Sequence, residues 1–195
     1  MLLGLFLILL SGFLLCYNIW DDYRAKISCS QIIEKFPSEG QQAYGNVGDG
    51  GVMGLPFYVT NPDMEMPVVM IDGHQYIGKI YIPDLELLLP VMSECSDANL
   101  KLAPCRYAGS AYQNNLVIAG HNYRSHFGTL RKLRYGDSIF FTDTEGNVFE
   151  YEVAEIEQLA STSVEAMKVS QWALTLFTCT VDGNNRVAVR CQQVA

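Results

Sequence analysis

The strongest constraint on this chain is an uninterrupted apolar run at its N-terminus. Residues 1–20 read MLLGLFLILLSGFLLCYNIW and contain no Asp, Glu, Lys or Arg. As a helix rising about 1.5 Å per residue, roughly 20 residues cross the hydrocarbon core of a bilayer. Tyr17 and Trp20 stand near the end of the run, where aromatic rings favour the membrane interface. We therefore expect an uncleaved, single-pass membrane anchor over residues 1–20.

Two other interpretations of this run stay open. A cleaved signal peptide needs a small-x-small site after the apolar stretch, and none follows it. A lipid-modified cysteine at Cys16 needs small residues before it, but residues 13–15 are the bulky Phe-Leu-Leu. No Lys or Arg precedes the run, so the positive-inside rule says almost nothing about orientation. Because the bulk of the chain follows the anchor, we expect that bulk to be extracellular, held at the cell membrane.

The rest of the chain divides into two parts. Residues 21–36 are expected to form a short helix that leads away from the membrane. Residues 37–61 are rich in Gly, Ser, Asn and Gln, which is typical of a linker, either a spacer that extends the domain's reach or a plain connector. The residue pattern of the sequence changes near Pro67. We therefore expect an anchor at 1–20, a juxtamembrane helix and linker at 21–66, and a folded domain at 67–195.

Short strand-like runs separated by glycine-containing turns fill the folded domain. The expected strands are residues 75–82, 85–92, 116–120, 138–142, 148–158, 173–179 and 186–192. Short helical turns are expected within residues 94–102, 129–133 and 163–167. Seven or eight short strands with few helices favour an all-β domain, closed or nearly closed into a β-barrel.

Composition excludes some functions. The net charge is −8, the sequence pI is about 4.8 and only 17% of residues are charged, so the chain has no basic footprint for nucleic acid. Six cysteines occur without a CxxC pair or any Cys/His spacing typical of zinc, so we expect neither metal nor cofactor. Cys95 and Cys105 are able to pair in an exported chain, and that alternative stays open.

Three side chains suited to acyl transfer stand at strand ends. Cys179 ends the apolar run of residues 173–179, and Arg186 opens the next run after a Gly- and Asn-containing turn. His121 follows the Val/Ile-rich residues 116–120. Each has a plainer interpretation, as a buried apolar thiol, a surface charge or a hydrogen-bonded loop histidine. Together they supply a nucleophile, a proton donor for the leaving amine and a cation for the oxyanion.

The segments that carry these residues resemble the signature of the sortases, membrane-anchored cysteine transpeptidases of Gram-positive bacteria. Residues 175–179 read TLFTC and match the family's TLxTC motif in full, while residues 118–122 read IAGHN. The resemblance assigns the catalytic roles to His121, Cys179 and Arg186. Arg190 is a rival for the arginine, but Arg186 opens the last strand before a short apolar stretch, as the family's arginine does. Arg190 would lie on the same face roughly 13 Å away.

What the resemblance implies about fold and activity is specific. It implies a closed eight-stranded β-barrel, cleavage of an LPxTG-like sorting signal between Thr and Gly, and a thioacyl-enzyme that an amine resolves. The partners would be surface proteins that bear the sorting signal, a peptidoglycan precursor or pilin that supplies the amine, and the membrane. A pilin-polymerising or mainly hydrolytic sortase is an alternative. An exported, non-catalytic β-barrel binding module with an inert thiol is another; a papain-like enzyme is disfavoured because His121 precedes Cys179.

Subclass and substrate contacts are less constrained. Residues 159–172 leave no room for the long helix of class B sortases, and no second apolar helix follows the last strand as in many class C enzymes. A class A-, D- or E-like enzyme remains, as does an unclassified one. Residues 61–67 either fold over the site as a lid or form an ordinary turn. Thr178 and Thr180, which flank the nucleophile, and Asn122, which follows the histidine, are expected to contact the sorting peptide.

Overall fold

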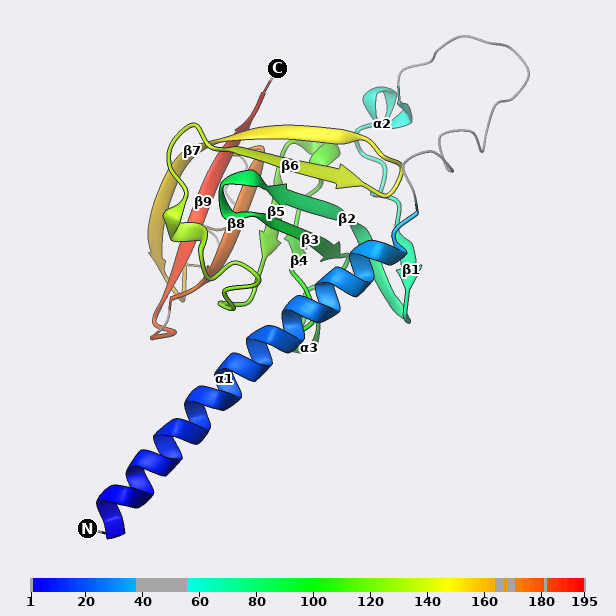
Figure 1. Cartoon of the computed structure of the whole chain (residues 1–195). Coiled ribbons are helices and arrows are strands. Elements are labelled where there is room, and N and C mark those ends of the chain that lie inside the picture. The colour runs from blue at the N-terminus through cyan, green and yellow to red at the C-terminus, as the bar shows by residue number, and fades with distance from the viewer. Residues whose placement is uncertain (1, 38–55, 164–166, 168–170, 181, 195) are drawn as a thin grey trace.

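A computed structural model describes residues 2–37, 56–163, 167, 171–180 and 182–194. Its β-strands form a closed barrel (Figure 1). Around the barrel the strands run in the order β2 (His74–Ile82), β3 (Leu87–Met92), β4 (Cys105–Ala108), β5 (Leu116–Ala119), β8 (Leu174–Cys179), β9 (Asn185–Gln193), β7 (Val148–Ala160) and β6 (Ser138–Asp143). Pairing of β2 with β6 closes the ring. The eight-stranded barrel expected from the sequence is therefore confirmed. Each of these eight strands thus has two neighbours in the ring, although β3 and β4 pair only at Met92 and Cys105.

Alternating burial explains why these segments form strands around one core. In β6 the residues alternate between partly exposed and buried, and the first half of β7 alternates in the same way. Side chains on the inner face, such as Ile80, Phe141, Tyr151 and Leu176, are completely buried. This period of two is the pattern of a sheet with one face on a core.

The direction of two strands sets the position of the site. β5 and β8 are neighbours and run parallel, with Ala119 opposite Phe177. Their C-terminal ends therefore lie at the same end of the barrel, although the last residues of the two strands, Ala119 and Cys179, are 60 positions apart in the sequence. Parallel neighbours need a long connection, and here β6 and β7 lie within it.

Several elements are shorter or differently placed than the sequence pattern suggested. The strands β4 and β1 (Val69–Ile71), which forms a hairpin with β2, have only four and three residues and were not predicted. The helical turns α3 (Asp97–Leu100) and η3 (Leu130–Lys132) fall inside two predicted ranges. Three short turns were not predicted: α2 (Phe57–Thr60), η1 (Pro83–Leu85) and η2 (Ala111–Gln113). The predicted turn at 163–167 lies mostly outside the described residues.

The N-terminal segment is one continuous helix, α1 (Leu2–Lys35), long and apolar enough to cross a membrane. Its N-terminal half projects away from the barrel, and its C-terminal half lies against it (Figure 1). Ala25, Cys29 and Ile32, spaced as one helical stripe, are buried there. The helix expected over residues 21–36 is present up to Lys35, and it continues the apolar helix of residues 2–20 without a break. Of the expected linker, residues 38–55 lie outside the described residues.

The segment considered as a lid contacts the far end of the barrel. Asp63 accepts a hydrogen bond from the Gln113 side chain at 3.0 Å, and the Pro67 carbonyl accepts one from Thr144 at 3.1 Å. Gln113 belongs to η2, which comes before β5. His121, Cys179 and Arg186 lie instead where β5 and β8 end and β9 begins. These contacts give the lid interpretation of residues 61–67 no support.

A glycine at the closure of the barrel provides a test of the fold. A Cβ atom at Gly78 would stand 2.2 Å from the Thr142 carbonyl oxygen of β6. We expect Gly78→Ala to lower the free energy of unfolding by about 3 kcal/mol, or the Tm by roughly 6–12 °C, because the β2–β6 backbones must separate. Thermal unfolding followed by circular dichroism measures this.

Gly146→Ala is the matched control. Gly146 also has a positive φ, of 87°, but a Cβ atom there meets nothing within 4 Å. Only the left-handed backbone opposes the alanine, at a cost of about 1 kcal/mol. Equal losses in the two variants would contradict a tight β2–β6 contact at Gly78.

Candidate active site

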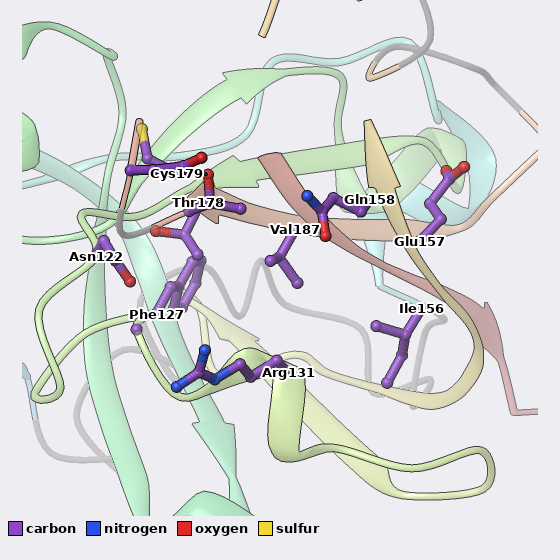
Figure 2. A pocket seen from close by; sticks show the side chains of 12 residues that line it. Asn122, Phe127, Arg131, Ile156, Glu157, Gln158, Thr178, Cys179 and Val187 are labelled. Atoms are coloured by element: carbon purple, nitrogen blue, oxygen red, sulfur yellow. Dashed lines mark hydrogen bonds between the residues drawn. The ribbon is translucent and has the colours of Figure 1, made fainter. Parts of the chain in front are cut away.

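Cys179 is the last residue of β8 and the only exposed residue of that strand. The five residues before it are buried, so the barrel core fixes the strand while its final side chain reaches the surface. Figure 2 shows its sulfur pointing away from Arg131 and Ile156. The sequence prediction of a thiol presented at a strand end agrees with this position.

Arg186 lies directly opposite Cys179 in the antiparallel β8–β9 ladder. Side chains of directly opposed residues share one face of the sheet, with Cβ atoms about 4.5–5.5 Å apart. The Arg186 Nη1 donates to the carbonyl oxygens of Gly183 at 3.3 Å and Asn185 at 3.1 Å. These bonds hold the guanidinium over the β8–β9 turn, beside the strand end that carries the thiol.

His121 follows the neighbouring strand at the same end of the barrel. The Gly120 N–H donates to the Phe177 carbonyl at 3.0 Å, so β5 stays attached to β8 up to the residue before the histidine. His121 is half-buried, and its Nδ1 has no hydrogen-bond partner among the described residues. Burial lowers the pKa of His121; the charge of Asp21 acts to raise it and that of Lys101 to lower it. The topology thus gathers the predicted thiol, imidazole and guanidinium at one barrel end.

A pocket of about 580 Å³ opens beside Cys179 (Figure 2). The predicted substrate contacts Thr178, Thr180 and Asn122 all line it. His121 and Arg186 do not. The remaining lining residues are Phe127, Gly128, Arg131, Ile156, Glu157, Gln158, Asp182 and Val187. The pocket therefore meets the thiol at its rim and extends towards η3 and β7.

The two threonines beside Cys179 differ in what they offer a ligand. Thr178 is 3% exposed, and its hydroxyl has no partner among the described residues, so it is available for a new hydrogen bond. The Thr180 hydroxyl donates to Asp182 and accepts from the Asn185 N–H at 3.1 Å. Thr180 therefore already organises the β8–β9 turn, and Thr178 is the better candidate for a substrate contact.

Arg190 has a structural role. It is 2% exposed, and its Nε donates to Glu157 at 2.7 Å. Its Nη1 donates to the Thr175 hydroxyl at 3.1 Å and the Met167 carbonyl at 3.3 Å. Thr175, the first threonine of the TLFTC run, thus supports the Arg190–Glu157 ion pair, four residues before Cys179 in the same strand. A guanidinium held in this way is not available to an oxyanion, which favours Arg186.

A second cysteine–histidine pair lies deeper in the protein. The Sγ of Cys29 on α1 is 3.3 Å from the Nε2 of His126. Both residues are buried, at 2% and 0% exposure. Burial raises the pKa of Cys29 to about 12. Burial and the charge of His121 lower the pKa of His126 to about 4, and the charge of Asp22 acts in the opposite direction. Both groups are therefore neutral at ordinary pH, and the pair serves packing rather than nucleophilic chemistry.

Sequence reasoning did not identify the residues around the imidazole. Tyr123 stacks on His121, with ring centroids 4.0 Å apart and planes 11° apart, and its hydroxyl donates to Asp21. Arg131, on η3, lines the pocket. An aromatic residue two positions after a histidine was the only local signal for Tyr123. No sequence signal pointed to Asp21, because it belongs to the membrane-proximal helix. Among the described residues, no three His, Cys, Asp or Glu side chains converge as a metal site requires.

Comparisons with known proteins agree with this geometry. A family model described as the sortase domain matches residues 80–194. The sortase A of Bacillus anthracis is 29% identical over 128 residues, which cover 62% of this chain and 60% of that protein. The sortase A of Listeria monocytogenes is 31% identical over 114 residues, covering 55% and 51%. The matched region thus spans about half to 60% of the length of these relatives.

Solved structures share the fold. A sortase D5 transpeptidase of Clostridium perfringens superposes with a TM-score of 0.60 at 21% identity, covering 87% of this chain and 98% of that one. Sortase C1 of Streptococcus suis gives a TM-score of 0.54 at 25% identity, covering 63% and 74%. The first of these similarities covers a larger share of this chain than the family model, which matches residues 80–194.

Proposed function

The chain belongs to the sortase family, and from that membership we propose that it is a membrane-anchored cysteine transpeptidase with His121, Cys179 and Arg186 as its catalytic residues. Its donor substrate would be an LPxTG-like sorting signal on a surface protein. Its acceptor would be an amine of a peptidoglycan precursor or a pilin. The catalytic domain would face the outside of the cell, held by residues 1–20.

Each catalytic residue has a defined part in the proposed reaction. The Cys179 sulfur forms a bond to the scissile carbonyl carbon, and the carbon–nitrogen bond then breaks. The leaving amine takes a proton from the His121 imidazolium, while the Arg186 guanidinium stabilises the oxyanion. In the second half, the acceptor amine attacks the thioacyl carbon and the thiolate leaves. His121 takes the proton from the attacking amine, which restores the enzyme.

One observation carries the proposal: Cys179 and Arg186 are paired directly across β8 and β9 at the strand end that His121 adjoins. The two side chains share one face of the sheet, with Cβ atoms about 4.5–5.5 Å apart. The guanidinium is therefore placed to stabilise the negative charge that develops on the attacked carbonyl oxygen. A non-catalytic binding module has no need for this juxtaposition of an exposed thiol and a cation.

The test uses the full chain in detergent micelles, because α1 supplies buried core residues that a fragment starting near residue 60 would lose. Fluorogenic LPxTG-type peptides that vary at each motif position are incubated with and without triglycine, and products are identified by mass spectrometry. We expect Thr–Gly cleavage, a thioester on Cys179 and a triglycine adduct.

The outcomes separate the alternatives. Cleavage that yields only the free acid, whatever the triglycine concentration, would replace the transpeptidase by a hydrolase. Neither cleavage nor a thioester across the whole library would remove the enzyme proposal and leave a binding module. The peptides that react also identify the sorting motif.

A further inference from the structure

Among the described residues, no carboxylate is hydrogen-bonded to the His121 ring. Its Nδ1 is buried and has no hydrogen-bond partner among the described residues. The imidazole instead stacks on the ring of Tyr123, with ring centroids 4.0 Å apart and ring planes 11° apart. Histidines in catalytic sites usually depend on a hydrogen-bonded third group for their orientation. Here the tyrosine ring occupies that role, so the fixation of Tyr123 decides where the imidazole lies.

Tyr123 is fixed by the helix that continues from the membrane anchor. Its hydroxyl donates to the carboxylate of Asp21, which also accepts from Arg24 Nη2 at 2.8 Å. The hydrogen bond from Tyr123 holds the pKa of Asp21 below its usual range, so the carboxylate is ionised at neutral pH. Burial and Asp21 raise the pKa of Tyr123 to about 12, so the phenol remains a donor.

Two further contacts dock the same loop on the same helix. The carboxylate of Asp22 accepts from the Ser125 N–H at 3.0 Å and from its hydroxyl at 2.8 Å. Cys29, two turns further along the helix, contacts His126 at 3.3 Å. Residues 122–127, the loop that follows the catalytic histidine, are therefore held at three points by α1, and each contact joins parts of the chain about a hundred positions apart.

We propose that Tyr123 and Asp21 are positioning residues for His121, so that the membrane-anchor helix completes the active site. This inference rests on the proposed function. Asp21 directly follows Trp20, the last residue of the apolar run, in an unbroken helix. The contact therefore ties the loop of the proposed catalytic histidine to the end of the apolar run of the helix. The anchor thus acts as a rigid support for the site as well as a tether.

The charge of Asp21 affects the pKa of His121, which a role in packing alone would not do. The charges that act on His121 are those of Asp21 from α1 and Lys101 after α3. His126, in the same loop, has its own pKa lowered by the charge of His121. Arg24 is paired to Asp21, and Cys179 and Arg186 lie at the neighbouring strand ends. Burial already lowers the pKa of His121, and the Asp21 charge opposes that shift. Neutralising Asp21 removes the opposition, so the pKa of the imidazole falls further.

The experiment compares Asp21→Asn, Tyr123→Phe and Tyr123→Leu in the full chain in detergent micelles. The substrate is the LPxTG-type peptide that the wild-type protein cleaves in the assay above. Tyr123→Leu, which removes the stack, is expected to lower kcat about 10- to 100-fold with KM within about twofold. Tyr123→Phe keeps the stack and loses less. Asp21→Asn is expected to move the limb of the kcat/KM pH profile that reports His121 to lower pH. Tyr23→Leu and Glu34→Gln, on exposed positions of the same helix, are the matched controls.

Tyr123→Leu tests the positioning role of the tyrosine, and Asp21→Asn tests the electrostatic link to His121. Wild-type kcat in Tyr123→Leu, or a change confined to KM, would overturn the positioning role. An unshifted His121 limb in Asp21→Asn would overturn the electrostatic link. The His121 titration is also followed by NMR of ¹³C-labelled histidine, which needs no turnover. An inactive wild-type chain with a normal Asp21→Asn titration shift would therefore count against the proposed function and leave the contact supported.

Discussion

Cys179→Ala is expected to lower peptide cleavage by more than about 10³-fold and to abolish the thioester adduct, with no measurable loss of stability. Removing the nucleophile of an acyl-transfer enzyme leaves only the weak contribution of binding and oxyanion stabilisation. The side chain is exposed at the end of β8, so its loss opens no cavity, and the free energy of unfolding should change by less than about 0.5 kcal/mol. Initial rates with the fluorogenic peptide and thermal melts measure both quantities.

The control for this prediction is the second thiol that has a histidine beside it. Cys29→Ala removes a buried side chain in contact with His126, so it should lower the Tm while the folded fraction still forms a thioester on Cys179. The opposite pattern, in which Cys29→Ala loses the adduct and Cys179→Ala keeps it, would move the nucleophile to the buried pair. Both variants are assayed at a temperature at which both are folded.

The positions of the proposed catalytic residues in the fold could be predicted because their signals are local. The TLFTC run ends an apolar strand, a polar turn follows, and Arg186 opens the next strand, so the Cys179–Arg186 pairing follows from a hairpin alone. His121 required one further step, the parallel pairing of β5 with β8, and the family resemblance supplied it. The barrel itself was predictable from repeated alternation in long strands such as β7.

What the sequence left open depends on contacts between distant segments. β1 and β4 have three and four residues, too few for a period of two to stand out. The docking of α1 had a signal, because Ala25, Cys29 and Ile32 follow a helical spacing, but the adjoining apolar run concealed that stripe. The bond between Asp21 and Tyr123 joins residues 102 positions apart, and no local pattern indicates such a pair.

Arg186→Ala is expected to lower kcat about 10²- to 10³-fold, the usual effect of removing one donor to an oxyanion, and to leave the fold intact. Arg186 is partly exposed, and its two hydrogen bonds are to carbonyls of the neighbouring turn, which water can satisfy after substitution. Arg186→Lys keeps the charge and loses the planar guanidinium, so its kcat should lie between those of the wild type and Arg186→Ala. Single-turnover acylation rates on the full chain measure the effect directly.

Arg190→Ala is the matched comparison, four residues along the same strand face, and the opposite result is expected from it. Its guanidinium is 2% exposed and bonds Glu157, Thr175 and the Met167 carbonyl, so its loss leaves a carboxylate and two buried polar atoms without a partner. Because the Glu157 side chain is 30% exposed, water recovers part of this, and we expect a loss of about 3 kcal/mol, or roughly 6–12 °C in Tm. The acylation rate of the molecules that remain folded should stay close to wild type. If Arg190→Ala instead lowers acylation at full stability while Arg186→Ala does not, the oxyanion role belongs to Arg190, and the direct pairing of Arg186 with Cys179 has no part in the chemistry.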